Sequence, residues 1–348
     1  CDYSFEVRKM INISPNTAII LMLITTFGWG SWFQCIKRLK GFPVSAFMLL
    51  LYSFALVIVW GAIGLFAAFQ PAYIGGNILQ MVGGSPGLAV LVVVCGAIFA
   101  MGMQIQMHVV SHIGLILSTS IFATINMIMN VTISTVVGGV EEGISLPLIV
   151  VAAAILVGAT IICQVAGRLR DKDNGRAEEK NYVTNKKAET KSMVMLVVCA
   201  VVFSPAYTLG MSKGVATDLN PAGFPSLVCV GLLCLGSFLG SILFSGVYLT
   251  RTKQWGCFKE KKYKSCYFMA FISGFCHYGG NIVHTVAIPV LSMAIAGPMS
   301  TVSNMWSYFW GIVYGEFKGS KKKTVIILSC GFLLYVIGIL LFCMNLYW

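Results

Sequence analysis

Polar and aromatic side chains set singly among long apolar runs are the residues of this chain that could do chemistry. If those runs cross a bilayer, each polar group costs free energy unless it faces a cavity or another polar group, so each is a candidate for a binding site. Asn and Gln supply uncharged hydrogen-bond donors and acceptors, while Trp and Tyr supply flat faces with one polar atom. The candidate substrate-binding residues are Trp29, Ser31, Trp32, Gln104, Asn126, Asn130, His277, Tyr278, Asn281, Ser300 and Asn304.

This set indicates an uncharged substrate with several hydrogen-bonding groups, such as a nucleoside, a nucleobase, a ureide or a sugar. A charged substrate normally requires an Arg, Lys, Asp or Glu within the membrane, and the predicted spans carry none near their middle. The pattern therefore disfavours nucleotide sugars and phosphorylated substrates. For Asn130 and Asn304 the alternative is a hydrogen bond between helices, an interaction worth ~0.6 kcal/mol on average.

Three residues are candidates for coupling or gating. His277 lies near the middle of an apolar run, where an imidazole could carry a proton. Glu142 and Glu316 fall at opposite membrane faces in the organisation derived below, so they could pair with other groups when one side closes. Solvation at a helix end is the alternative for both. Protons or sodium are thus expected partners.

The sequence lacks the patterns of soluble enzymes and metal sites. It contains no His/Cys cluster with metal-ligand spacing and no paired mid-span carboxylates. The twelve cysteines are scattered without a C-x-x-C pair, which is typical of small apolar packing residues rather than of disulfides or metal ligands. No cofactor is expected. A membrane enzyme or sensor is an alternative to a transport function, and its candidate polar pairs are Glu141/Glu142 and His108/His112.

The elements that must position these residues are membrane helices. The chain is 57% hydrophobic with a mean hydropathy of +0.85, well outside the range of soluble domains. A helix crosses a bilayer with ~20 mostly apolar residues, and the alternation of a membrane β-barrel is absent. The run Phe268–Val313 carries no charged residue, so only its length and Pro289 divide it into two spans. Ten spans are predicted: Thr17–Ile36, Val44–Phe69, Gly87–Met107, Ile113–Val137, Leu146–Val165, Met193–Gly210, Gly223–Leu249, Cys266–Ala287, Ile288–Val313 and Thr324–Leu346.

A hydrophilic stretch, Gly167–Lys191, separates two apolar halves of similar length. It holds eight Lys/Arg and five Asp/Glu in a chain whose charged fraction is only 10%. We therefore predict a first five-helix repeat over residues 1–166, a cytoplasmic linker over 167–191 and a second five-helix repeat over 192–348.

Basic residues predict the orientation. With ten spans, 21 of the 24 Lys and Arg residues fall on one side, and only Arg8, Lys9 and Lys213 fall on the other. Loops rich in Lys and Arg stay cytoplasmic, so both termini should lie on the outer side of the membrane. The plasma membrane is the expected location. The net charge of +12 is thus interpreted as a topology feature, and nucleic acid is not an expected partner.

Five helices in each half predict an inverted repeat, because the second half then enters the membrane from the opposite side. Two sequence parallels support duplication. Gly41–Pro43 and Gly223–Pro225 repeat the tripeptide Gly-Phe-Pro before a span. At an offset of 174, Leu117-Ser118, Ile121, Asn130 and Glu142 recur as Leu291-Ser292, Ile295, Asn304 and Glu316.

Three patches resemble the ureide permeases and their bacterial relatives, within the drug/metabolite transporter superfamily. They are Gly28–Trp32, Cys95–Phe99 and Trp310–Gly319. The resemblance implies an all-α protein of ten transmembrane helices in a five-plus-five inverted repeat, acting as a secondary transporter. The central stretch has no G-x-x-x-x-G-K-[ST] motif, so nothing indicates use of ATP. A homodimer is a further expectation.

The sequence therefore predicts an alternating-access transporter of a small neutral polar metabolite, coupled to protons. An uncoupled facilitator of the same shape is the main alternative.

Overall fold

The protein is described by a computed structural model that covers residues 13–39, 41–113, 115–175, 191, 194–203 and 205–346. Helix makes up 84% of the structure, and the described ranges contain no strand, which confirms an all-α fold. The first half contains α2 (Pro15–Ser31), η1 (Trp32–Arg38), α3 (Val44–Phe69), η2 (Pro71–Ile74), α4 (Ile78–Gly84), α5 (Pro86–Ile113), α6 (Leu115–Val136) and α7 (Leu146–Asp173). The second contains η3 (Cys199–Phe203), α9 (Pro205–Gly214), α10 (Ser226–Arg251), η4 (Trp255–Lys259), η5 (Lys261–Tyr263), α11 (Lys264–Met299), η6 (Ser300–Val302), α12 (Ser303–Val313) and α13 (Lys322–Met344).

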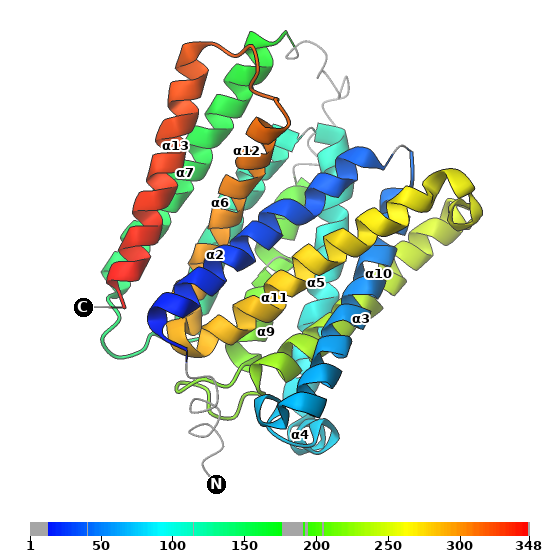
Figure 1. Ribbon diagram of the computed structural model, residues 1–348, viewed down its shortest axis with the longest axis vertical. Coiled ribbons are helices and arrows are strands. Elements are labelled where there is room, and N and C mark those ends of the chain that lie inside the picture. The colour runs from blue at the N-terminus through cyan, green and yellow to red at the C-terminus, as the bar shows by residue number, and fades with distance from the viewer. Residues whose placement is uncertain are drawn as a thin grey trace.

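Eight helical stretches in the described ranges are long and apolar enough to cross a membrane, so the chain is a polytopic membrane protein. One of them, Lys261–Val313, has 53 residues, far more than the ~20 that one crossing needs. Its backbone leaves the helical region at Ser292, where φ is 59° and ψ is 160°. Beyond this break the chain turns back, and α12 runs beside α2 (Figure 1). The ten-helix count and the inverted repeat remain predictions.

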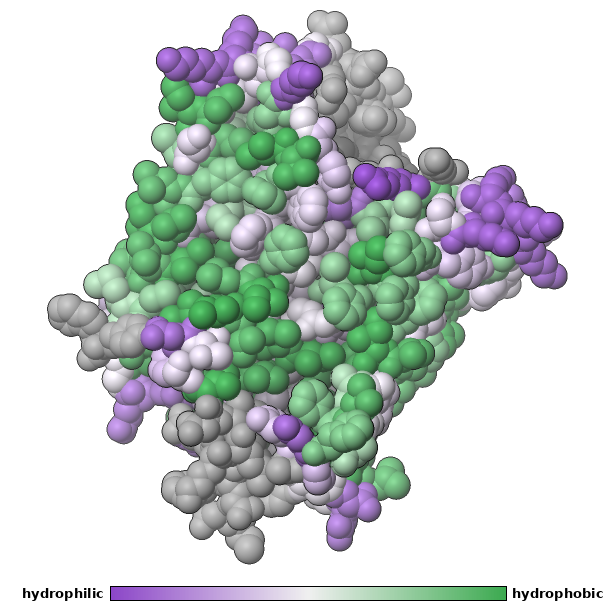
Figure 2. All heavy atoms as spheres, in the orientation of Figure 1, coloured by the Kyte–Doolittle hydropathy of each residue, from purple (hydrophilic) through white to green (hydrophobic). Residues whose placement is uncertain are grey.

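The bundle has one basic end. The end of α7, the turn between α12 and α13, η1, and the connection with η4 and η5 all lie toward the same end of the bundle. α2 begins and α13 ends at the opposite end (Figure 1). We use the name basic end for the end that carries Arg38, Arg168–Lys172, Arg251–Lys264 and Lys318–Lys323. Figure 2 shows hydrophobic residues in a broad band across the face, with hydrophilic residues gathered at the ends. This separation is what a bilayer requires of a spanning protein.

Close helix contacts are made where small residues replace bulky ones, as is usual between membrane helices. α10 packs against α5 so tightly that a Cβ added to Gly236 would lie 1.9 Å from the carbonyl oxygen of Val93. One turn later, a Cβ on Gly240 would lie 2.5 Å from the carbonyl oxygen of Ala97. Ser237 Oγ, between them, donates to the Gly96 carbonyl at 2.9 Å. The α5–α10 contact thus depends on glycine.

α7 and α13 form an antiparallel pair whose ends bind each other. Asp173, the last residue of α7, accepts hydrogen bonds from the Lys321 amide at 2.9 Å and the Thr324 hydroxyl at 2.6 Å. At the other end, Asn345 Oδ1 accepts from the Ser145 amide at 2.8 Å, just before α7 begins. Each helix therefore satisfies part of the other's unpaired N-terminal backbone.

α7 is longer than its apolar pattern predicted. It continues past Val165 to Asp173 and so contains the first seven residues of the hydrophilic stretch, whose positions 176–190 lie outside the described residues. The extension is stable because its charged residues are compatible with a helix and find partners, Arg170 with Asp171 and Asp173 with Thr324. This extension brings Arg170 to the cavity described next.

Candidate substrate cavity

A cavity of about 490 Å³ lies between helices of both halves. The first half contributes lining residues from α2, η1, α5, α6 and α7. The second half contributes lining residues from α9, α11, η6 and α12. Eight of the eleven predicted substrate-binding residues line it, and so does Glu316. The eight are Trp29, Trp32, Asn126, Asn130, His277, Asn281, Ser300 and Asn304.

Helix geometry explains why Ser31, Gln104 and Tyr278 lie outside the cavity. Successive residues of a helix point about 100° apart, so a residue next to a lining residue can face another element. Ser31 donates to the Phe27 carbonyl at 2.7 Å and accepts from Trp310 Nε1 at 2.7 Å. Gln104 accepts from the Ser245 hydroxyl between α5 and α10. The buried Tyr278 ring packs on Tyr52, with centroids 6.1 Å apart.

The two glutamates proposed for gating are in different surroundings. Glu142 is exposed in the connection between α6 and α7 and does not line the cavity. Glu316 lines the cavity from the turn between α12 and α13, at the basic end. Only Glu316 is therefore in a position to contact a molecule inside the cavity.

One wall of the cavity is an aromatic cluster from α2, η1, α5 and α11. Trp29 Nε1 donates to Asn281 Oδ1 at 2.7 Å and also lies 3.2 Å from the His277 carbonyl oxygen. The His277 ring is stacked on the Phe99 ring, with the ring centroids 5.9 Å apart, and its centroid lies 5.0 Å from that of the Trp32 ring. Trp29 can approach α11 because Gly280 lies beneath its ring, where an added Cβ would be 3.0 Å from the indole. This wall offers flat faces beside polar groups.

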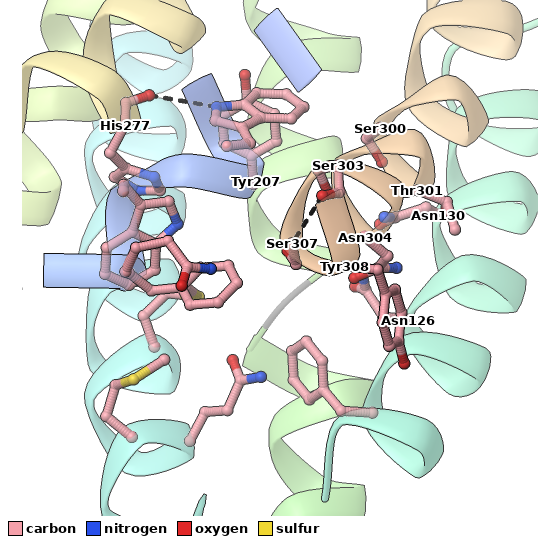
Figure 3. Close-up of a pocket in the computed structure, with 18 of the residues that line it drawn as sticks. Asn126, Asn130, Tyr207, His277, Ser300, Thr301, Ser303, Asn304, Ser307 and Tyr308 are labelled. Carbon is pink, nitrogen blue, oxygen red and sulfur yellow. Dashed lines mark hydrogen bonds between the residues drawn. The ribbon is translucent and has the colours of Figure 1, made fainter. Parts of the chain in front are cut away.

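The facing wall is polar and comes from α6, η6 and α12. Figure 3 shows His277 on one side of the cavity and Asn126, Asn130, Ser300, Asn304 and Tyr308 on the other. The second group repeats at intervals of four residues, the spacing that places side chains on one helix face. Thr208 Oγ1 donates to Asn130 Oδ1 at 2.7 Å, which fixes one of these amides.

Several polar atoms in the cavity have no hydrogen-bond partner among the described residues. Each belongs to a side chain that is more than nine-tenths buried, and buried polar groups are normally paired. His284 shows the arrangement: Nδ1 pairs with the Tyr207 hydroxyl at 2.8 Å, while Nε2 is unpaired. These atoms are the ones a bound molecule would satisfy. They are Oε1 of Gln34 and Gln106, both ring nitrogens of His277, Nδ2 of Asn281 and Nε2 of His284.

Sequence reasoning missed part of the lining. Arg170 was assigned to the linker by its charged neighbours, but Gln164, Gly167 and Arg170 follow the helical spacing of one α7 face, which is a usable indication. His284, which lies inside α11, was not among the predicted residues. Gln34 and Gln106 carry the same indication as Gln104, an amide within a predicted span, and were missed. Nothing in the sequence distinguished Tyr207, Thr208 and Tyr308 from packing residues.

The cavity reaches the basic end and stops inside the bundle in the other direction. At the basic end its lining includes Arg170 and Glu316, whose side chains are 13% and 27% exposed. Toward the opposite end its lining residues Met293, Thr208 and Asn130 are buried. In the structure, access to the cavity is therefore from the basic end.

Two other features bear on chemistry. The described residues contain no group of three or more His, Cys, Asp or Glu side chains that could hold a metal ion. The side chains of His108 and His112 lie outside the described residues. The lining described here consists of neutral polar, aromatic and aliphatic groups, with one ion pair at the basic end.

Comparison with known proteins shows the fold alone. No family model and no curated protein matches the chain. A solved structure described only as the crystal structure of a protein superposes with a TM-score of 0.63 over 95% of this chain and 98% of that chain. The two sequences are 12% identical, so the similarity extends to the arrangement of helices and carries no information about substrate.

Proposed function

We propose that the chain is a secondary transporter of a small polar metabolite without net charge, such as a nucleoside, a nucleobase, a ureide or a sugar. The observation that carries the proposal is the cavity inside a bundle of apolar helices, lined by amides, hydroxyls and aromatic rings and, in the part of the chain that the structure describes, reached from the basic end. Transporters bind substrate near the middle of the membrane and expose it to one side at a time. The cavity supports the first property and the closed far end supports the second.

The unpaired atoms support a substrate with both acceptors and donors. Asn281 Oδ1 already accepts a hydrogen bond from Trp29, which leaves Nδ2 as the donor that a substrate can use. A neutral His277 ring presents one donor and one acceptor. The amide oxygens of Gln34 and Gln106 are acceptors, nearer the basic end. Carbonyl, hydroxyl and ring N–H groups would satisfy this combination without formal charge.

Helix packing supports the inverted repeat that we propose. In a five-plus-five repeat, the pairs α2 and α9, α3 and α10, α5 and α11, α6 and α12, and α7 and α13 would be equivalent. Each packing contact should then have a counterpart. α5 packs on α9 as α11 packs on α2, and α6 packs on α9 as α12 packs on α2. α5 on α10 corresponds to α11 on α3. The end-to-end binding of α7 and α13 is also reciprocal.

Uptake into proteoliposomes tests the function. We expect at least one compound from a panel of labelled nucleosides, nucleobases, ureides and sugars to enter vesicles containing the protein, with saturation and competition by unlabelled compound. A coupled carrier accumulates it under an imposed proton or sodium gradient, whereas a facilitator only equilibrates it. If no compound enters faster than into protein-free vesicles, the proposed function is wrong.

The orientation is a further part of the proposal. Because the basic end carries most of the Lys and Arg residues, it should be cytoplasmic, and both termini should be outside. An epitope added after Trp348 should therefore be labelled by antibody on intact cells, while an epitope inserted at Gly175 should need permeabilised cells. The reverse labelling pattern would overturn this orientation.

A further inference from the structure

Arg170 and Glu316 are charged residues that line the cavity and contact each other. Arg170 Nη1 donates to Glu316 Oε2. The same guanidinium donates from Nε and Nη2 to Asp171 Oδ1, at 3.1 and 2.9 Å. Its Cζ also lies 5.0 Å from the centre of the Phe317 ring. The guanidinium of Arg170 therefore donates hydrogen bonds to two carboxylates.

The two carboxylates differ in accessibility. The Asp171 side chain is 6% exposed and does not line the cavity. The Glu316 side chain is 27% exposed and does line it. Asn174 Nδ2 donates to the Glu316 carbonyl at 3.3 Å and so helps to hold the turn. A species that enters the cavity from the basic end reaches Glu316, while Asp171 remains with Arg170.

This contact pattern favours a cation over an anion. An anion that displaced Glu316 from Arg170 would leave the carboxylate of Glu316 without this partner, which is costly in a partly desolvated site. A cation that takes Glu316 leaves Arg170 bound to Asp171, so both charges stay compensated. Asp171 thus removes most of the cost of separating Arg170 from Glu316.

We infer that Glu316 binds a small monovalent cation, a proton or Na⁺, and that Asp171 is the positioning residue that lets Arg170 release it. With a proton, an O–H bond forms on the Glu316 carboxylate, the proton comes from the aqueous side of the cavity, and the hydrogen bond from Arg170 Nη1 breaks. With Na⁺, the carboxylate oxygens become ligands instead. In both cases Arg170 keeps its two hydrogen bonds to Asp171.

Two amide oxygens of the cavity, which are also available to the substrate, are suited to bind a cation. Oε1 of Gln34, on η1, and Oε1 of Gln106, on α5, are more than nine-tenths buried, line the cavity and have no partner among the described residues. Uncharged oxygen acceptors of this kind are what a hard cation takes as ligands beside a carboxylate.

The charge around the turn is mostly positive, which makes the contribution of Asp171 necessary. Arg38, on η1, lies 5.9 Å from the centre of the Tyr314 ring in the same turn. Positive groups oppose cation uptake, and a buried carboxylate beside Arg170 offsets them. The other charged groups and tyrosines on the elements packed here are Arg168, Lys172 and Asp173 on α7, Tyr308 on α12, Tyr314, Lys318 and Lys321 in the turn, and Lys322 and Lys323 at the start of α13.

The assignment of this cation as the coupling ion rests on the proposed transport function, but its binding does not, so the test uses purified protein without substrate. Infrared difference spectra on acidification report the carbonyl band of a protonated carboxyl group. Thermal stability in NaCl, against choline chloride at equal ionic strength, reports Na⁺. We expect one of these two responses in the unmodified protein and its loss in Glu316→Gln.

Two further variants separate this role from a structural ion pair. In Asp171→Asn, Arg170 holds Glu316 more strongly, so half-maximal response should need about tenfold more cation, a typical effect of one opposite charge. In Arg170→Gln the competitor is gone, so the shift should have the opposite sign. These opposite shifts decide the question even if Glu316→Gln cannot be purified.

Shifts of the same sign in both variants, or a response that survives Glu316→Gln, would overturn the inference. So would the absence of both responses in the unmodified protein. If the protein transports a compound but shows neither response, this inference fails and the transport proposal stands. If it shows the response but transports nothing, the cation site stands and its role in coupling falls.

Discussion

Gly236→Ala should prevent normal assembly of the bundle. The added Cβ would lie 1.9 Å from the carbonyl oxygen of Val93, which belongs to the backbone of α5 and cannot rotate away. α10 and α5 would have to separate, and the neighbouring Gly240 contact at 2.5 Å would be lost with them. Overpacking usually costs ~1–3 kcal/mol, and a backbone clash belongs at the upper end of that range or beyond.

The matched control lies on the same helix. A Cβ on Gly246 would meet no atom within 4 Å, so Gly246→Ala should be neutral or stabilising by up to ~1 kcal/mol from helix propensity. Yield of monodisperse protein and apparent melting temperature in detergent measure both variants. Equal behaviour of the two variants would mean that α5 and α10 are not in the contact described here.

Long apolar helices with turn residues at both ends could be predicted from the sequence. α3 runs over Val44–Phe69 as predicted, since Pro43 precedes it and Pro71 follows it closely. Two boundaries could not be predicted from composition. α7 continues into charged sequence because those side chains have partners in space. The break after Pro289 comes at Ser292, and a non-glycine residue with positive φ is not expected from local preference.

The candidate site was predictable by residue type and only partly by position. His277 and Asn281 could be selected because neutral polar groups within a span are uncommon and costly. Their neighbour Tyr278 could not be separated from them, because which helix face meets the cavity depends on packing with α2, α3 and α5. Arg170 required knowledge of where α7 ends. Tyr207 required knowledge that α9 lies against α11, where it reaches His284.

The central claim is that this cavity binds the transported molecule, and two adjacent residues of α11 test it most directly. His277 lines the cavity with two unpaired ring nitrogens, whereas Tyr278 points away from it and packs on Tyr52. Replacing one partner of a substrate hydrogen bond should cost ~1–3 kcal/mol, or roughly 5- to 150-fold in affinity. Tyr278→Phe keeps the ring and removes only a hydroxyl that lies outside the cavity lining.

The measurement is equilibrium binding of whichever panel compound the vesicles take up, using purified His277→Ala, Tyr278→Phe and unmodified protein of equal melting behaviour. Asn304→Ala, on the facing wall, serves as a second cavity variant. We expect affinity to fall within the stated range in His277→Ala and Asn304→Ala and to stay unchanged in Tyr278→Phe. Unchanged affinity in both cavity variants, or an equal loss in Tyr278→Phe, would contradict the assignment of this cavity as the substrate site.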